Sequence, residues 1–279
     1  MKKVYILGAG PSLKAFEEAE VDSGDSVIMI NDHTSTVQNN KIVEKLKGKD
    51  VYIMCNIGQE GFNSEVFNKI EVKGCLTNRF KPDLGLWQIH KDKQRKNFEG
   101  GALNNLGYLP HIAEDEPYLY TWRGPPNRNL VDMRTRDGRK IEHMPDEAEQ
   151  YLIPIYENKL IGNCSYYATL YAIINLKADH TVYYGLDFYN NVDIKKSWYL
   201  HPPNYGTSEW WNMRVRYEGE HMKVLYDDYL AKFFQSVTLE FFTTIDDCFK
   251  SSNIVCNTLT FEDPNIANQT WYSSGFRLT

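Results

Sequence analysis

The chain has 279 residues, of which 42% are hydrophobic and 24% are charged, a balance typical of a globular protein with a substantial core. Lysine and arginine total 31 against 37 aspartates and glutamates, and the resulting charge of −6 argues against a protein that follows nucleic-acid phosphates over its whole surface. No apolar run approaches the roughly 18 residues that a membrane span needs, and because the chain starts with a strand-like segment we expect neither a secretory signal peptide nor a membrane anchor. We therefore expect a cytoplasmic protein, with peripheral contact to a membrane as the alternative.

Cysteine usage indicates buried thiols rather than disulfides or a zinc site. The cysteines are scattered without the paired spacing of metal sites: Cys55, Cys75, Cys164, Cys248 and Cys256. The sequence has no pair of aspartates flanking a single residue, the arrangement that commonly presents a divalent ion to a nucleotide sugar, and no histidine pair with metal-ligand spacing. We therefore expect no catalytic metal.

The first part of the chain alternates between strand-like and helix-like segments. The apolar runs 3–7, 27–30 and 51–55 have the pattern of strands buried on both faces, and residues 13–20 have helical composition. Such alternation predicts a parallel sheet with covering helices. The expected fold class is α/β, with a Rossmann-like parallel sheet and helices on both faces.

Residues 78–158 interrupt this pattern. The segment is polar, contains several glycines and prolines, and carries two basic clusters, 91–96 and 134–140. We interpret it as an inserted irregular subdomain within a single domain that spans residues 1–279. The basic clusters would meet nucleic-acid phosphates locally if the partner were a nucleic acid, but solvated surface is the simpler interpretation of such charge runs.

Regular structure is expected again beyond this insertion. Apolar residues at helical spacing predict a helix over 165–176, and 181–188 has the composition of another buried strand. Residues 189–220 are longer than a connection requires and rich in aromatic residues, which is typical of a lid over a ligand. An amphipathic helix over 222–234 and a last strand over 253–256 complete the sheet.

A glycine-rich loop stands between the first strand and the first helix. It reads Gly8-Ala9-Gly10-Pro11-Ser12, and glycines there let the backbone approach a phosphate or ribose while the helix N-terminus offers free N–H groups. Leu13 occupies the place of the third glycine of the dinucleotide fingerprint, which argues against a nicotinamide or flavin cofactor. A nucleotide-binding loop is the functional interpretation, and a plain tight turn is the structural alternative.

Further polar residues fall at the carboxyl ends of the predicted strands. Asn31 follows the second strand and Asn56 the third, so both amides would lie beside the glycine loop and could read a base or a ribose. Asp187 ends the strand over 181–188 at the same edge, where capping the next turn suits it best. The hydroxyl of Tyr189 would be available to a phosphate at the mouth of the lid.

His221 is the leading candidate for a general base. It lies between the expected lid and the amphipathic helix, where a helix N-terminus disfavours the imidazolium and keeps the ring able to accept a proton. His201 in the lid and His33 beside Asn31 are its rivals. A capping or surface histidine is the structural alternative.

Two segments resemble a known family. Residues 1–14, Met1 to Lys14, and Tyr184-Gly185-Leu186-Asp187-Phe188-Tyr189, preceded by a helix over 161–176, resemble the bacterial sialyltransferases of glycosyltransferase family 42. That family transfers sialic acid from its CMP-activated form to a sugar hydroxyl, with inversion and without a metal. The resemblance implies a GT-A-like variant of the Rossmann-like fold and CMP-sialic acid as co-substrate, with no cofactor.

The resemblance also implies roles for individual residues. The loop 8–12 would hold the cytidine nucleotide together with a set of polar and strand-end residues: Asn31, Asn56, Asn163, Gly185, Asp187 and Phe188. Tyr189 and, from the lid, Tyr199 would donate to the leaving phosphate. His221 would remove the proton from the acceptor hydroxyl.

This sequence also departs from the family. Ala9 stands where the family usually has asparagine, and Gly162-Asn163-Cys164 replaces Thr-Ser-Gly before the central helix, where a preceding arginine is also missing. These positions lie near the donor, so the donor need not be CMP-sialic acid. The glycine loop and the Gly-x-Asp segment are also similar to domains that include a pterin diphosphokinase and flagellin-glycosylation proteins, which leaves a phosphotransferase or a non-catalytic nucleotide-binding module as alternatives.

The expected partners follow from these interpretations. They are a nucleotide sugar and a glycan or other hydroxyl acceptor, with a nucleic-acid acceptor as a variant. The resemblance to sialyltransferases further implies a homo-oligomer.

Overall fold

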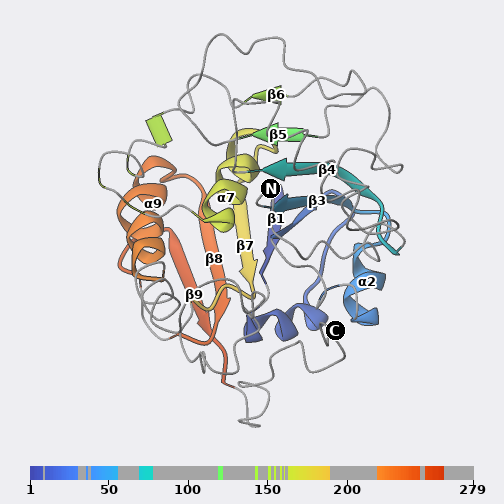
Figure 1. The fold of residues 1–279 in the computed structure, drawn as a ribbon. Helices are drawn as coiled ribbons and strands as arrows, with labels where there is room; N and C mark the ends of the chain where they lie inside the picture. Colours follow the sequence, from blue (N-terminus) through green and yellow to red (C-terminus); the bar gives the residue numbers. More distant parts are fainter. Residues whose placement is uncertain are drawn as a thin grey trace, which may run out of the picture.

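The computed structural model in Figure 1 describes residues 1–8, 10–30, 36, 39–55, 69–77, 119–121, 142–143, 150–151, 154, 158, 160, 163–188, 219–245 and 249–260. Side chains are described for the same residues except 11, 55, 74–77, 119–121 and 142–143.

The described strands form one sheet of nine strands in the order β6-β5-β4-β3-β2-β1-β7-β8-β9, and every neighbouring pair is parallel. The strands are β1 Lys3–Leu7, β2 Ser26–Ile30, β3 Asp50–Cys55, β4 Val72–Thr77, β5 Leu119–Thr121, β6 Glu142–His143, β7 His180–Tyr184, β8 Thr238–Thr243 and β9 Ile254–Thr258. The α/β fold with a Rossmann-like parallel sheet is thereby confirmed.

Helices cover both faces of this sheet (Figure 1). One face carries η1 Pro11–Glu18, a 3-10 helix, and α2 Asn40–Leu46. The other carries α7 Cys164–Ile174 and a longer helix, called helix 219–233 below. Helix 219–233 is α-helical over 219–224, π-helical in η4 Leu225–Leu230 and α-helical again in α9 Ala231–Phe233.

The strands near the centre of the sheet explain why the apolar runs do not alternate with polar residues. In β1, Val4 and Ile6 pack with the cluster of α7 and helix 219–233, whereas Tyr5 and Leu7 pack with the cluster of η1 and α2. Side chains on both faces are therefore buried, because successive residues of a strand point to opposite faces.

The strand order places β1 at the point where the chain reverses direction across the sheet. From β1 the chain proceeds through β2 to β6 on one side, and then returns to β7, β8 and β9 on the other. The helices that follow β1 and β7 lie on opposite faces, as right-handed crossovers in opposite directions require. The carboxyl ends of β1 and β7 thus flank the topological switch point, where open α/β sheets generally bind ligands.

Several element boundaries differ from the expected ones. The first helix spans Pro11–Glu18 rather than 13–20, and the strand expected over 181–188 ends at Tyr184. Gly185 and Phe188 have φ values of 74° and 48°, which take the chain out of extended geometry. Strands β5 and β6 fall within residues 78–158 and extend the sheet at its edge.

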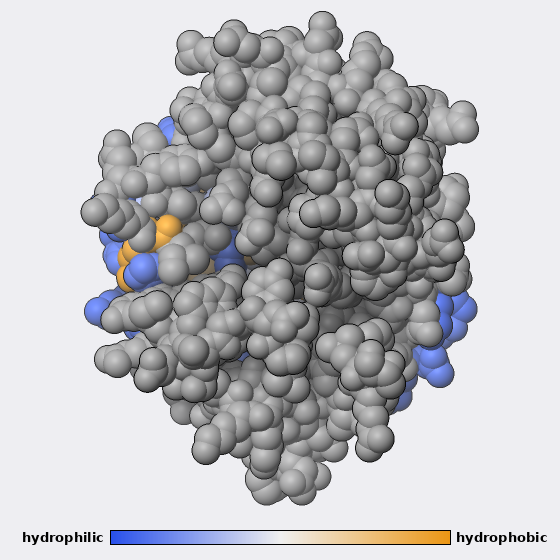
Figure 2. Space-filling view, viewed as in Figure 1, coloured by the Kyte–Doolittle hydropathy of each residue, from blue (hydrophilic) through white to orange (hydrophobic). Residues whose placement is uncertain are grey.

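The carboxyl-terminal end of helix 219–233 is tied to the β8–β9 connection. The Asn253 side-chain amide donates to the carbonyl oxygens of Ala231, Phe234 and Val237, each at 3.1 Å. Earlier in the helix, the Asp227 carboxylate accepts bonds from the N–H groups of Lys250 and Ser251, which belong to the same connection. The Asn253 bonds satisfy backbone carbonyl groups at and just beyond the end of the helix. Figure 2 shows a hydrophobic area among hydrophilic atoms on the side of the molecule where this helix lies.

Candidate functional site

The candidate site is the carboxyl edge of the sheet at the switch point between β1 and β7. In a strand–helix–strand unit the helix runs antiparallel to the strands, so the first residues of α7 and of helix 219–233 lie at this same edge. Figure 1 shows η1 beyond the tips of β7 and β8. The edge therefore gathers the glycine loop, residues 185–188, Asn163 and His221.

Both glycines of the loop are required by the approach of the chain after β7. The Gly8 N–H donates to the Tyr184 carbonyl at 2.7 Å, and the Gly10 N–H donates to the Gly185 carbonyl at 2.9 Å. A Cβ at Gly8 would lie 2.3 Å from the Gly185 carbonyl oxygen, and one at Gly10 would lie 2.3 Å from Oδ2 of Asp187. Glycine is therefore needed at both positions for contacts within the protein, whether or not a ligand binds.

Asp187 joins three strand ends. Its Oδ2 accepts the Ser12 N–H and the Ser12 hydroxyl, both at 3.0 Å, at the start of η1. Its Oδ1 accepts the Thr244 N–H at 2.8 Å and the Thr244 hydroxyl at 3.0 Å, after β8. The Asp187 carboxylate is thus a cross-link between the ends of β1, β7 and β8.

Burial affects the pKa of this carboxyl group. Asp187 is 4% exposed, and removal from water raises the pKa of its carboxyl above the usual range, although the bonds from Ser12 and Thr244 act in the opposite direction. The expectation that Asp187 has a structural role is consistent with these contacts. They reach η1 and β8, however, rather than the local turn that was expected.

The Ser12 hydroxyl completes this cross-link. It donates to Asp187 and accepts the Gly185 N–H at 2.8 Å, so it bonds on both sides. The Ser12 N–H is taken by Asp187, and the Leu13 N–H donates to the Gly10 carbonyl at 3.1 Å. The expectation that η1 offers free N–H groups to a phosphate is therefore wrong at residues 12 and 13, and Pro11 has no N–H.

Asn163 caps helix α7. Its side-chain Oδ1 accepts the N–H groups of Ser165 at 2.9 Å and Tyr166 at 3.4 Å, and also the Ser165 hydroxyl at 2.6 Å. An asparagine at this position suits the helix start because its oxygen replaces the missing intrahelical acceptor. Oδ1 is committed to the helix, which leaves the NH2 of Asn163 as the part of the side chain suited to donate to a ligand.

Phe188 directs its ring into the core. The ring lies 5.5 Å from that of Phe249, 5.7 Å from that of Phe241 and 6.0 Å from that of Tyr226, measured between centroids. These contacts attach residues 185–188 to helix 219–233 and β8. The role of Phe188 is thus explained by packing, and its assignment to a nucleotide stays a prediction.

His221 is the third residue of helix 219–233 and is partly buried. Its neighbour Met222 is 1% exposed, and Leu225 and Tyr226 are fully buried, so the first turns of the helix are firmly packed against the core. The prediction that His221 lies at the start of a helix is confirmed. Its role as a base stays a prediction.

The other predicted site residues lie outside the described part of the chain: Ala9, Asn31, His33, Asn56, Tyr189, Tyr199 and His201. The backbone of Pro11 is described but not its side chain. The expected lid, 189–220, lies outside the described residues except for its last two positions.

Thr243 and Thr244 were missed in the sequence. The Thr243 hydroxyl donates to the Leu186 carbonyl at 3.2 Å and lies 3.3 Å from Oδ1 of Asp187. The signal that could have found them is the alternation of Thr238 to Thr243, which is typical of a strand and whose end carries two adjacent hydroxyl residues.

Among the residues that the structure describes, no group of three or more histidine, cysteine, aspartate or glutamate side chains is arranged to hold a metal ion. No helix in the described part of the chain is long and apolar enough to span a bilayer.

Comparison with known proteins gives a remote likeness in structure. No family model matches the sequence, and no curated protein matches it either. Among solved structures, the chain is similar to the sialyltransferase CstII from Campylobacter jejuni, whose structure was determined in complex with a substrate analogue, cytidine-5'-monophosphate. The identity is 16%, the match covers 93% of this chain and 88% of that chain, and the TM-score is 0.44.

Proposed function

We propose that the protein is a metal-independent, inverting glycosyltransferase that moves a sugar from a nucleotide-sugar donor to an acceptor hydroxyl. The observation that carries the proposal is the switch point, where the loop 8–12 and residues 185–188 meet beside the first turns of two helices, one capped by Asn163 and the other carrying His221 as its third residue. A nucleotide at this position would lie within reach of an amide donor and a histidine base. CMP-linked sialic acid, or a similar sugar, is the donor that we propose.

The proposed chemistry needs one proton acceptor. His221 takes the proton of the acceptor hydroxyl as that oxygen attacks the anomeric carbon, and the bond from this carbon to the phosphate oxygen breaks. Tyrosine hydroxyls from Tyr189 and Tyr199 donate to the departing phosphate in place of a metal ion. Residues 189–220 then close over the donor and keep out water, which would otherwise hydrolyse it.

In this proposal the loop 8–12 provides a backbone surface beside the donor rather than a set of N–H groups that bind its phosphate. The N–H groups of Gly8, Gly10, Ser12 and Leu13 are occupied within the protein, so the loop offers a fixed backbone surface on which a ribose can lie. Recognition of the base and phosphate then falls to side chains: Asn31, Asn56, Asn163, Tyr189 and Tyr199.

The phosphotransferase alternative receives less support from these contacts. A diphosphokinase requires carboxylates that are free to hold magnesium beside the phosphates. Among the described residues at this edge, Asp187 is the buried carboxylate, and both of its oxygens are occupied, Oδ2 by bonds from Ser12 and Oδ1 by bonds from Thr244.

Thermal denaturation with nucleotides tests the proposed donor site. The protein is melted with CMP, UMP, GMP or AMP, each with EDTA present throughout. A nucleotide at about 100 times its dissociation constant stabilises the fold by about 2.7 kcal/mol, which corresponds to a rise of roughly 5 °C in Tm. A rise with CMP alone supports the CMP-linked donor, a rise only with another nucleotide replaces it, and no rise with any of them contradicts the site.

Hydrolysis and transfer then test the chemistry. The protein is incubated with CMP-sialic acid and EDTA, with and without a panel of glycans, and CMP release is followed. Release that persists in EDTA supports metal-independent transfer. Acceptor-dependent release identifies the hydroxyl partner, and the oligomeric state is measured on the same sample by light scattering.

A further inference from the structure

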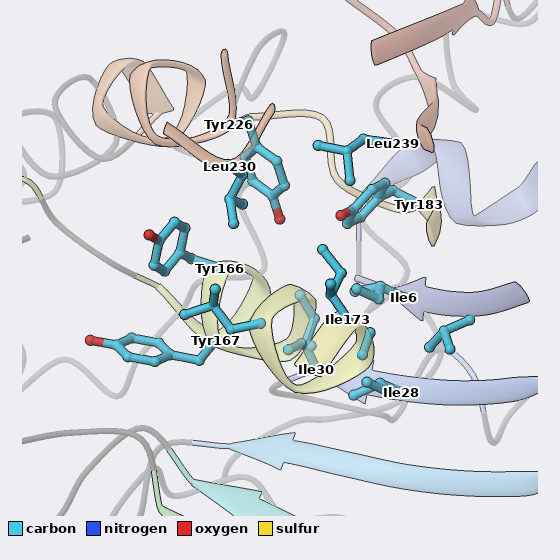
Figure 3. Close-up of a cluster of buried hydrophobic side chains, with 14 of the residues drawn as sticks. Ile6, Ile28, Ile30, Tyr166, Tyr167, Ile173, Tyr183, Tyr226, Leu230 and Leu239 are labelled. Atoms are coloured by element: carbon cyan, nitrogen blue, oxygen red, sulfur yellow. The ribbon is translucent and has the colours of Figure 1, made fainter. Parts of the chain in front are cut away.

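Helix 219–233 is joined to the rest of the core by buried hydroxyl groups. Tyr226 on this helix, Thr169 on α7 and Tyr183 on β7 are all fully buried, and their hydroxyl groups meet at one point. The Thr169 oxygen lies 3.0 Å from each of the two phenol oxygens. Figure 3 shows the hydroxyl groups of Tyr183 and Tyr226 turned toward each other within the hydrophobic cluster.

The direction of each hydrogen bond follows from the available protons. Thr169 donates its single hydroxyl proton to the Ser165 carbonyl at 2.8 Å, as threonines in helices commonly do. Thr169 therefore accepts from both phenols, while Tyr183 also accepts a bond from Thr181 at 2.9 Å. Thr169 is thus an acceptor for the proton of Tyr226, whose hydroxyl also interacts with those of Ser165 and Tyr183.

These bonds give the helix a defined position that apolar contacts alone do not give. The Tyr226 ring packs edge-on against the rings of Tyr183 and Phe241, with centroid distances of 5.5 and 5.2 Å, and the hydroxyl bond adds a directional contact to this packing. A buried hydroxyl that leaves its acceptor loses a bond that the apolar surroundings cannot replace. Burial also raises the pKa of Tyr226 to about 12 and that of Tyr183 well above its usual value, so both phenols remain donors near neutral pH.

We propose that Tyr226, through its bond to Thr169, is a positioning residue for His221. The two residues are five positions apart on one helix, or about 7.5 Å along its axis. Tyr226 also lies within the π-helical stretch Leu225–Leu230, where the regular α-helical bonding that would otherwise fix the helix is interrupted. The proposal rests on the proposed function, because positioning His221 matters only if His221 acts on the substrate.

The chain offers a matched pair of variants for the test. Tyr226→Phe and Tyr183→Phe each remove one hydroxyl from a fully buried tyrosine that donates to the same Thr169 oxygen. Only Tyr226 is on the helix of His221. A purely structural role predicts a loss of stability in both variants without a specific effect on His221, whereas positioning predicts a change at His221 for Tyr226→Phe alone.

The primary readout is the NMR signal of the His221 ring in protein labelled with 13C-histidine, assigned by its loss in His221→Gln. We expect Tyr226→Phe to shift this signal and Tyr183→Phe to leave it in place, while both variants lower Tm. With a turnover assay, kcat of Tyr226→Phe falls about tenfold with KM for the donor unchanged, because misplacement of the base affects chemistry more than binding. Equal shifts in both variants, or no shift in either, overturn the proposal.

Substitutions at Thr169 keep the test decisive if Tyr226→Phe does not fold. Thr169→Ser retains the acceptor and is expected to preserve the His221 signal, whereas Thr169→Val removes it and is expected to shift the signal. The same signal in both Thr169 variants contradicts the proposal. The NMR result does not require turnover, so a wild-type protein that lacks transferase activity refutes the proposed function and leaves the positioning result to be judged separately.

Discussion

Gly10→Ala introduces one methyl group at the point where the glycine loop meets Asp187. The backbone of Gly10 has φ −73° and ψ 170°, which alanine adopts without strain, so the cost of the substitution comes from contact. The added Cβ would lie 2.3 Å from Oδ2 of Asp187 and 2.9 Å from the Gly185 carbonyl oxygen. The Asp187 side chain must therefore move away from Ser12.

The expected cost follows from the bonds that this movement breaks. Asp187 accepts two hydrogen bonds from Ser12, and a buried bond to a charged group contributes about 1.5–3 kcal/mol, so Gly10→Ala is expected to lower the free energy of unfolding by roughly 3–6 kcal/mol. Urea denaturation followed by circular dichroism measures this difference.

Gly24→Ala is the matched control. A Cβ at Gly24 has no neighbouring atom within 4 Å, and the backbone there is outside the left-handed region. Both substitutions reduce the freedom of the unfolded chain equally, so their difference isolates the contact at Gly10. A Gly10→Ala protein within about 1 kcal/mol of the Gly24→Ala protein would refute the claim that Asp187 holds this loop.

Other substitutions test the remaining contacts by urea denaturation over a range of pH. Asp187→Asn is expected to lower the unfolding free energy by about 2–4 kcal/mol, because either orientation of its side-chain NH2 group would face a backbone N–H. Since burial raises the pKa of Asp187 in the folded state, protonation stabilises the wild type, and the difference in unfolding free energy between wild type and Asp187→Asn is expected to grow as pH falls toward the unfolded value of 3.8. A difference that stays constant or shrinks in acid would contradict this reasoning. Burial of Glu17 raises its pKa, but the bonds from Lys14, Asn39 and Lys41 outweigh this effect and lower the pKa of its carboxyl group. Glu17→Gln is therefore expected to lower the unfolding free energy by about 1 kcal/mol at pH 7 and by less as pH falls below 4.5. Glu18→Gln is the control, because the Glu18 side chain is exposed. Asn163→Ala is expected to cost about 1 kcal/mol through loss of the helix cap and Asn163→Ser much less, and equal losses would argue against capping.

The sequence predicted the sheet where burial on both faces leaves a simple pattern. The runs around Val4, Val27 and Val51 became β1, β2 and β3 because their apolar residues pack into the hydrophobic clusters on both faces of the sheet. Strand β4 contains Lys73 and Gly74, and β5 and β6 are only three and two residues long, so hydrophobic pattern alone did not reveal them.

The candidate site was less accessible to sequence reasoning because its contacts are long-range. A glycine that accommodates a phosphate and a glycine that accommodates a carboxylate look the same in one sequence. The carboxylate beside Gly10 belongs to Asp187, which is 177 positions away. Likewise, the partner of Tyr226 is Thr169, and no local spacing links these two residues.

CMP release from CMP-sialic acid by the wild type and by His221→Gln, in EDTA, tests the central claim most directly. The proposal predicts metal-independent release by the wild type and a fall of about 10²–10⁴-fold in His221→Gln, with the affinity for CMP nearly unchanged. Absence of release from the wild type together with absence of CMP binding would contradict the proposed function, and undiminished release by His221→Gln would contradict the role of His221.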